Sequence, residues 1–385
     1  MVLFHFRVPT ADSFQFNRLR FRYATMLRTI IHCLLVAGFF FTSAEFTCRV
    51  DDWLREGFPV LSMPDSDTQL VLEDGSIRRG RPHGRFKKWE LNAFGFRGPE
   101  IGLEPSPGAI RVMLLGASES FGLYESEQKE YPAQLRAILH SKGNYEVINA
   151  AVAGMTVRSM IPYWEHWASQ FHPHLVVIYP TPLFYLNLPW RETTEEPSTQ
   201  VRTVNRDGTP PLKLGSRLLF RLKDHIHTPR FIQWWRDERG IAAKTAGKGS
   251  DWLFASVPKE NLDSFIRDLE ELAEAIRLRG AEPILMTHAV RCMFPPEAQD
   301  SYDLHHMRVH FPRATESVMA AFEAAAVKRT IELGREKGWE VIDIAAVMNG
   351  KRDLFADLSH FTDRGAAIAA QLIAGHVVTL SPVDK

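Results

Sequence analysis

The chain has 385 residues, of which 45% are hydrophobic and 24% charged, so its composition is that of an ordinary globular protein with a sizeable core. Lysine plus arginine and aspartate plus glutamate both number 46, and the formal net charge is zero. This balance lacks the basic excess expected of a nucleic-acid-binding protein, so we predict no nucleic-acid partner. The 3 cysteines exclude a disulfide scaffold and match no zinc-binding spacing.

The first 49 residues (1–49) combine a basic flank with an apolar stretch. Residues 30–41 read IIHCLLVAGFFF, and four arginines precede them: Arg18, Arg20, Arg22 and Arg28. A positive flank before an apolar stretch is typical of a signal peptide or a signal anchor. The strictly apolar part is shorter than the ~20 residues that a spanning helix needs. Both the cleaved and the uncleaved form therefore remain open.

The two forms predict different fates for an exported chain. An uncleaved anchor would tether the protein to the inner membrane through residues 29–46, whereas cleavage near Ala44 would release it. Small residues at Thr42, Ser43 and Ala44 suit cleavage. In either case the rest of the chain is expected on the periplasmic side of the cell envelope. Met26 is an alternative to Met1 as the first residue of the protein.

Residues 50–108 are rich in glycine, proline and charge. We interpret them as an irregular, membrane-proximal segment that leads into the main domain, residues 109–380. From Ile110 onward, apolar runs alternate with amphipathic segments. This alternation predicts a parallel sheet covered by helices on both faces, with functional residues at the carboxyl ends of its strands.

The pattern predicts five strands and five helices. The strands are expected at 110–115, 145–150, 175–179, 283–288 and 339–344. The helices are expected at 131–142, 156–171, 259–279, 314–337 and 362–378, the last with Thr362 as its N-cap.

Residues 188–258 interrupt the alternation. A structureless loop of that length is uncommon in a compact domain unless it is functional or partly folded. We therefore interpret the segment as an insertion over the strand ends, either a lid or a partner surface. It contains FIQWWRDERG (231–240), whose aromatic side chains suit stacking on a sugar or packing against the domain; packing is the favoured interpretation.

A serine follows the first strand, in the stretch RVMLLGASESFG (111–122). Gly116 and Ala117 allow a sharp turn from strand to helix, which places Ser118 at the carboxyl edge of the sheet. The next residue, Glu119, is expected to face solvent. Because Ser118 occupies the turn itself, we predict that it, rather than Ser120, is the reactive serine.

A serine nucleophile needs a base, and FADLSHFTDRGA (355–366) offers one. Asp357 lies three residues before His360 and can accept a hydrogen bond from its Nδ1–H, leaving Nε2 free to take a proton. This stretch follows the fifth strand, again on the carboxyl side of the sheet. A serine after a strand or an aspartate before a helix is usually structural, but the two features on one edge together predict a catalytic site.

Three segments resemble a known family: GASESFG, NAAVAG and DLSHFTDRG are similar to blocks I, II and V of the SGNH (GDSL-like) hydrolases, in the right order and spacing. The resemblance covers residues 110–190 and 263–378, and the upstream LNAFGFRGPE is similar to exported bacterial members. It implies a flavodoxin-like three-layer α/β/α sandwich with a five-stranded parallel sheet. It also implies serine ester chemistry that needs no cofactor and no metal.

The resemblance assigns four residues by position. Ser118 would be the nucleophile and would also supply its N–H to the oxyanion hole. Gly154, in NAAVAG, would supply a second backbone donor. His360 would be the base and Asp357 the residue that orients it. Each preorganised donor to an oxyanion is worth about 3–4 kcal/mol of barrier.

The chain departs from the family pattern at two points. Ala117 stands where the first block has aspartate. The third block supplies an asparagine to the oxyanion hole after the third strand, but here the stretch reads VVIYPTPLFYLN (176–187). Thr181 or Asn187 is the candidate substitute, and Asn187 lies farther from the strand end. The departures predict a modified oxyanion hole.

The sequence therefore predicts an exported serine esterase that acts on an acylated small molecule or an envelope glycan. An O-acyltransferase that passes the acyl group from the same serine to a sugar is the first alternative. A catalytically degenerate binding or scaffold domain is the second. Ala117 and the missing asparagine favour that second alternative, whereas the serine, histidine and aspartate argue against it.

Four further histidines need an interpretation. His306 and His310 are four residues apart, as in a helical metal pair, but no carboxylate or cysteine set completes a site. We expect them, with His305, to be surface residues. His288 follows the fourth strand and is expected either to line the pocket or to end the strand.

Overall fold

The computed structural model describes residues 11–63, 69–75, 77–187, 215–223, 228–293, 295–297 and 300–380. The chain forms two compact units. The smaller consists of Met1–Pro64 with Pro211–His227, and the larger of Asp65–Pro210 with Thr228–Lys385.

The larger unit is built on a five-stranded parallel sheet in the order β6-β5-β7-β8-β9. The strands are β5 (Ile110–Gly116), β6 (Tyr145–Asn149), β7 (Leu175–Tyr179), β8 (Glu282–Met286) and β9 (Glu340–Ile342). The order 2-1-3-4-5 is that of flavodoxin-like sheets. The predicted fold class is confirmed, and each strand overlaps its predicted range.

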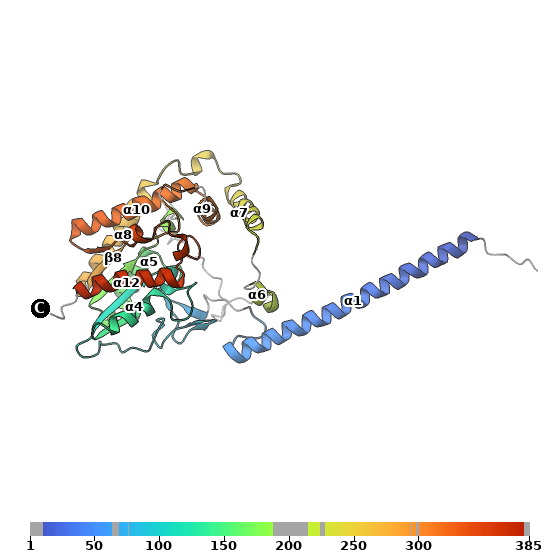
Figure 1. Ribbon diagram of the computed structural model, residues 1–385, viewed down its shortest axis with the longest axis horizontal. Helices are drawn as coiled ribbons and strands as arrows, with labels where there is room; N and C mark the ends of the chain where they lie inside the picture. The colour runs from blue at the N-terminus through green and yellow to red at the C-terminus, as the bar shows by residue number, and fades with distance from the viewer. Residues whose placement is uncertain are drawn as a thin grey trace, which may run out of the picture. The chain divides into compact units, whose positions relative to one another are not determined.

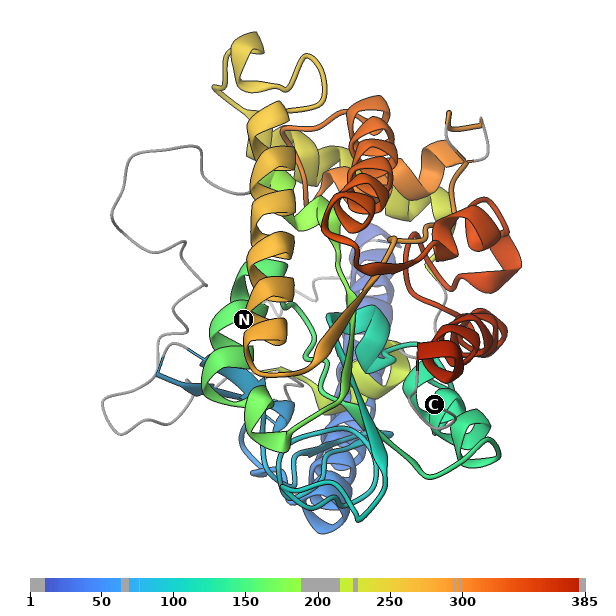
Figure 2. The same cartoon turned by 90° about the vertical axis from the view of Figure 1, so that its left-hand side faces the viewer.

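Helices cover both faces of this sheet (Figure 1). On one face α4 packs beside α12, and on the other α8 packs beside α5 and α10. Figure 2, turned by 90°, shows α8 (orange) on the opposite side of the sheet from α12 (red). The α-helices among the described residues of this unit are α3 (Ser118–Phe121), α4 (Tyr131–His140), α5 (Val157–His166), α7 (Arg230–Thr245), α8 (Lys259–Leu278), α9 (Ser301–Arg308), α10 (Glu316–Lys337), α11 (Ile344–Met348) and α12 (Asp363–Leu380).

The central strand explains why the sheet needs two covering layers. All seven residues of β5 are buried, as expected of a strand with a helix layer on each face. Helices α5, α10, α11 and α12 begin at a side chain that accepts from one of their free N–H groups. Thr156 and Ser159 form a capping box at the start of α5. Thr362 Oγ1 accepts from the Gly365 N–H at 3.2 Å, so the predicted cap of the last helix is confirmed.

The segment predicted to be irregular contains short regular elements. The N-terminal helix α1 (Ala11–Glu56) extends into it. Two antiparallel pairs follow in the larger unit, β1 (Val71–Asp74) with β2 (Ile77–Gly80), and β3 (Arg85–Phe86) with β4 (Trp89–Glu90). Strand pairs this short leave little periodicity in the sequence.

The predicted insertion, residues 188–258, is described in part, and residues 188–214 and 224–227 lie outside the described residues. In the larger unit its helix α7 packs against α9. The Trp234 ring stacks on the His305 imidazole with centroids 3.7 Å apart, which agrees with the packing interpretation of the aromatic motif. Phe231 and Trp235 of the same helix are 74% and 57% exposed, so packing accounts for only part of the motif.

In the smaller unit, α1 contains a stretch, Thr25–Arg55, that is long and apolar enough to cross a membrane. Its most apolar window has a mean hydropathy of 1.6, and none of that window is buried. A signal sequence passes the same test, so the stretch is compatible with a signal anchor and with a signal peptide.

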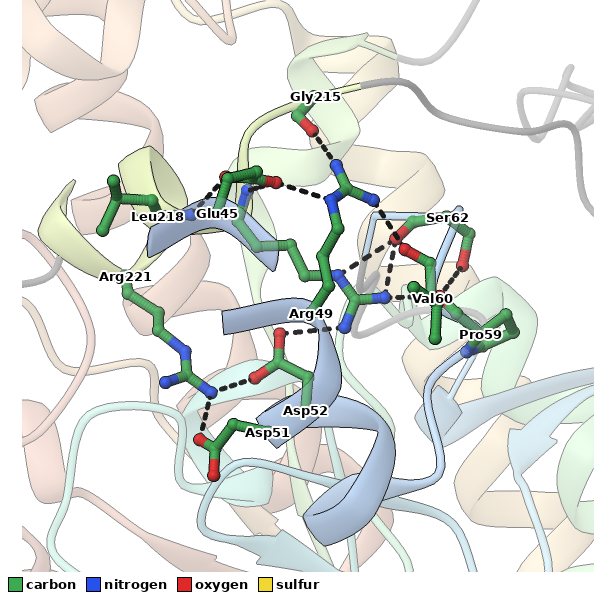
Figure 3. Close-up of polar contacts among 11 residues, drawn as sticks. Glu45, Arg49, Asp51, Asp52, Pro59, Val60, Ser62, Gly215, Leu218 and Arg221 are labelled. Atoms are coloured by element: carbon green, nitrogen blue, oxygen red, sulfur yellow. Dashed lines mark hydrogen bonds and ion pairs between the residues drawn. The ribbon is translucent and has the colours of Figure 1, made fainter. Parts of the chain in front are cut away.

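A polar cluster fastens the second helix of this unit, α6 (Arg217–Lys223), to the C-terminal part of α1 (Figure 3). The Glu45 carboxylate accepts from the N–H groups of Arg217 and Leu218, both at 2.9 Å, and so caps α6. The fully buried Arg217 guanidinium pairs with Asp52 at 2.9 Å. The cap and the ion pair hold α6 against α1.

A buried arginine fastens the segment before the sheet to helix α3. The Arg97 side chain, 5% exposed, pairs with Glu130 at 3.0 Å. One of its nitrogens, Nη1, donates to the carbonyls of Phe121 and Gly122, each at 2.6 Å. These carbonyls lie at the C-terminal end of α3, so Arg97 compensates both a buried carboxylate and a helix end.

Arg97→Ala is therefore expected to lower the free energy of unfolding by about 3–5 kcal/mol, because it leaves the Glu130 charge buried without a partner. Urea unfolding of the full chain in detergent measures the loss. Arg364→Ala is the control: Arg364 pairs with Asp353 on the surface, where both side chains are more than half exposed, and its loss should cost less than about 1 kcal/mol. Equal losses in the two variants would contradict the role of Arg97.

Candidate active site

The end of β5 determines which serine faces the site. A side chain at Gly116 would put its Cβ 2.0 Å from Ser120 Oγ, so glycine is required there. Ser120 is fully buried, and its Oγ accepts from the Tyr131 hydroxyl at 2.7 Å. Ser118, the first residue of α3, lies instead within 2.9 Å of His360, measured from Oγ to Nε2.

The opposite nitrogen of His360 contacts Asp357. The distances from Nδ1 to the two carboxylate oxygens are 2.8 and 2.9 Å. The carboxylate also accepts from the backbone N–H groups of His360 and Ser359, at 2.9 and 3.1 Å, which fixes its position. With Nδ1–H donated to Asp357, Nε2 can accept the Ser118 proton. The structure thus brings together the three residues singled out from positions 118, 357 and 360.

The loop after β6 carries Gly154 to the same edge of the sheet. The Val152 N–H donates to the Gly116 carbonyl at 3.2 Å, so the loop is bonded to the strand that precedes Ser118. Gly154 has φ of +81°, a conformation that favours glycine. Asn149, the last residue of β6, donates to the Ser120 carbonyl at 3.1 Å and so links the end of this strand to α3.

The two candidate substitutes for the missing asparagine have partners elsewhere. The buried Thr181 hydroxyl donates to Glu119 Oε2 at 3.3 Å. The Asn187 amide donates to the His310 carbonyl at 2.8 Å. An oxyanion role for Thr181 stays a prediction. Ala117 is fully buried, a place where an aspartate would require its own partners.

The expectation that Glu119 faces solvent is wrong. Its side chain is 2% exposed, and it accepts from the Ser359 hydroxyl at 2.9 Å. His288 is also buried and lies two residues after the end of β8, between Glu119 and Glu323, 3.8 Å from the first and 2.9 Å from the second. Sequence reasoning missed these contacts because Glu323 comes from a helix distant in the sequence. The feature of the sequence that could have indicated these contacts is the Glu119 carboxylate, directly after the predicted nucleophile Ser118.

Neighbouring charges tune the central histidine. Burial would lower the pKa of His360, but its hydrogen bond to Asp357 and the charges of Glu119, Asp357 and Glu125 outweigh burial and raise it above the usual value. Burial likewise would raise the pKa of Asp357, but the bond to His360 keeps it low. Asp357 is therefore ionised wherever His360 titrates, which stabilises the imidazolium.

Tyr124 and Glu125 complete the surroundings of His360. The Tyr124 ring lies 4.9 Å from the imidazole, centroid to centroid, and burial together with Asp357 raises the Tyr124 pKa to about 12. Burial raises the pKa of Glu125 to about 7. Glu125 thus gains or loses its charge over the same pH range in which a histidine titrates.

The expectation that His305 is a surface residue is wrong. It is buried, stacks on Trp234, and contacts Glu316 through Nδ1 at 3.1 Å. The half-exposed His306 contacts Asp237 through its own Nδ1 at 2.9 Å. Among the described residues, no group of three or more histidines, cysteines and carboxylates is arranged to hold a metal ion.

Comparisons with known proteins give structural likenesses alone. No protein-family model matches the chain, and no curated protein matches it. The similar solved structures include an acetyl xylan esterase, with 15% identity over 70% of this chain and 100% of that one, at a TM-score of 0.40.

Two other similar structures are bacterial. A lipase/acylhydrolase from Enterococcus faecalis has 16% identity over 72% of this chain and 100% of that one, with a TM-score of 0.39. A GDSL-like lipase from Bacteroides thetaiotaomicron has 12% identity over 70% of this chain and 89% of that one, with a TM-score of 0.37. Likenesses this low carry no information on activity or substrate.

The site geometry makes a prediction that does not depend on catalysis. In the wild-type chain His360 should be half-protonated above pH 6.5, the ordinary value, and Asp357→Asn should lower its pKa because the acceptor charge is lost. NMR titration of ¹³C-labelled histidines in detergent measures both. Asp353→Asn, which removes an exposed aspartate, should leave the His360 titration in place. A His360 pKa unaffected by Asp357→Asn would contradict the assigned hydrogen bond.

Proposed function

We propose that the protein is an exported serine esterase with Ser118 as nucleophile, His360 as base and Asp357 as the residue that orients the base. The observation that carries the proposal is the continuous contact from Ser118 Oγ to His360 Nε2 (2.9 Å) and from His360 Nδ1 to Asp357 (2.8 Å). This arrangement is the one that converts a neutral serine hydroxyl into a nucleophile.

In the first half-reaction, Ser118 Oγ attacks the ester carbonyl carbon and its proton passes to His360 Nε2. The N–H groups of Ser118 and Gly154 are proposed to stabilise the resulting oxyanion. Collapse of this intermediate breaks the bond to the alcohol oxygen, which takes the proton from His360. The acyl group then remains on Ser118 as an ester.

In the second half-reaction, a water molecule attacks the acyl-enzyme carbonyl carbon, and His360 accepts a proton from that water. The second intermediate releases Ser118, which recovers its proton from His360, and the carboxylic acid leaves. A sugar hydroxyl in place of water would make the protein an O-acyltransferase by the same steps. The hydrolase is preferred because it needs no acceptor subsite.

The proposed location is the outer side of the inner membrane. The exposed apolar stretch of α1 and the arginines before it support export. Of the two forms compatible with this stretch, the proposal takes the uncleaved anchor. The proposed substrates are the acylated glycans and small esters of the cell envelope, the class that the SGNH-like motifs and this location favour together.

Full-length protein in detergent is expected to release p-nitrophenol from p-nitrophenyl acetate, and Ser118→Ala or His360→Ala should reduce kcat by about 1,000-fold or more. Ser126→Ala, an exposed serine on the segment after α3, is the matched control and should retain wild-type turnover. Acetate measured with and without a glycan acceptor separates hydrolysis from transfer. If the folded wild-type chain releases no p-nitrophenol, the esterase proposal is refuted and the binding-domain alternative is favoured.

Export is tested with alkaline phosphatase fused after Leu61, which should be active because this enzyme matures only outside the cytoplasm. A fusion after Ala24, before the apolar stretch, should be inactive. If α1 is an uncleaved anchor, the Leu61 fusion keeps its full size and stays in the membrane pellet after alkaline carbonate extraction. A product shortened at Ala44 and found in the supernatant would favour the signal peptide, and an inactive Leu61 fusion would contradict export.

A further inference from the structure

Glu119 is a buried carboxylate that the proposed reaction does not use. It is the second residue of α3, directly after Ser118, and its side chain is 2% exposed. An ionised carboxylate removed from water is costly unless partners compensate it. The partners of Glu119 therefore indicate why the charge is placed there.

These partners come from three other segments at the carboxyl edge of the sheet. The Ser359 hydroxyl donates to Oε1 at 2.9 Å from the loop that carries His360. The Thr181 hydroxyl, after β7, donates to Oε2 at 3.3 Å. The His288 imidazole, after β8, lies 3.8 Å from Oε1, an ion pair longer than a hydrogen bond. One side chain after β5 thus links the ends of three strands and the His360 loop.

A second buried carboxylate holds His288 in place. Nδ1 of His288 contacts Glu323 at 2.9 Å, and the Glu323 side chain is 3% exposed. Although burial would lower the pKa of His288, the two glutamates raise it to about 10, so the ring is an imidazolium near neutral pH. Burial alone would raise the Glu119 pKa, but His288 and the charge of His360 lower it. One cation between two carboxylates leaves a net negative charge.

That charge lies beside the reacting pair. Glu119 Oε2 is 3.3 Å from Ser118 Oγ, which is itself 2.9 Å from His360 Nε2. The hydroxyl has one proton and two acceptors. When His360 is neutral, the proton can point to Nε2. When His360 is protonated, Nε2–H donates to Oγ and the serine proton can point to Glu119. Glu119 therefore favours the protonated histidine by its charge and as the second acceptor.

We propose that Glu119, held by His288, Thr181 and Ser359, is a positioning residue of this site that aligns the Ser118 and His360 segments and makes His360 a stronger base. The inference rests on the proposed function for its effect on the reaction, because the imidazolium formed in each half-reaction is the species that Glu119 stabilises. Its effect on the titration of His360 is independent of catalysis.

The test follows His360 by NMR in full-length protein with ¹³C-labelled histidines in detergent, its resonance assigned by its loss in His360→Gln. The groups that face His360 are Asp357 on its own loop, Glu119 on α3, and Tyr124 and Glu125 after α3. Glu119→Gln keeps the shape of the side chain but removes its charge, so the pKa of His360 should fall by about 1 unit or more. Glu127→Gln removes an exposed carboxylate two residues from Glu125 and should leave that pKa in place.

His288→Gln gives the opposite sign and is the second variant if Glu119→Gln does not fold. Without the imidazolium, the Glu119 charge has one counter-charge fewer, and the pKa of His360 should rise. A structural role alone would not move the pKa in opposite directions in the two variants. A His360 titration unchanged in a folded Glu119→Gln or His288→Gln variant would overturn the proposal.

Activity separates this inference from the proposed function. In an active enzyme, the acid limb of kcat/KM should move to lower pH in Glu119→Gln, in step with the NMR titration, because the reaction needs neutral His360. A wild-type chain without esterase activity whose His360 still responds to Glu119→Gln would refute the esterase and retain the electrostatic coupling. If the enzyme is active but Glu119→Gln changes neither the acid limb nor the His360 titration, the esterase is retained and the electrostatic coupling is refuted.

Discussion

The close approach of Ser120 to Gly116 is the constraint on which the site depends. Because Gly116 has no Cβ, the Ser120 side chain can fill the space beside it, which allows α3 to begin at Ser118, two residues after the strand ends. That geometry buries Ser120 against Tyr131 and leaves Ser118 facing His360. Arg97 and Asn149 then bond the carbonyls of α3, so the short helix is held from outside the sheet as well as by β5.

The same edge concentrates buried charge. Asp357 and Glu119 approach His360 from different segments, and both favour its protonated form. A base of raised pKa is a stronger proton acceptor, but a larger fraction of it is protonated at neutral pH. The proposed esterase would therefore work best on the alkaline side of the ordinary histidine pKa. His288 limits the effect, because its positive charge compensates part of the Glu119 carboxylate.

The parts of this arrangement that depend on local pattern could be predicted from the sequence. The strand run 110–115, the cap at Thr362, and the serine, histidine and aspartate all lie in short segments whose residue types and spacing carry the information. The buried polar contacts could not be predicted in this way. From the sequence alone, Glu119 is expected on the surface; its burial follows from contacts with Thr181, His288 and Ser359. The role of Arg97 likewise depends on its ion pair with Glu130. Such partners are distant in sequence, and pairing is set by the tertiary fold.

The most direct measurement is the position of a covalent adduct. Full-length protein would be treated with a fluorophosphonate, which phosphonylates activated serines, and the tryptic peptide Val112–Lys129 would be fragmented by mass spectrometry. The peptide contains three serines, Ser118, Ser120 and Ser126, so the site of modification is decisive. The structure predicts stoichiometric modification of Ser118, abolished in His360→Ala. Modification of Ser120 or Ser126, or no modification of folded wild-type protein, would contradict the proposed role of Ser118.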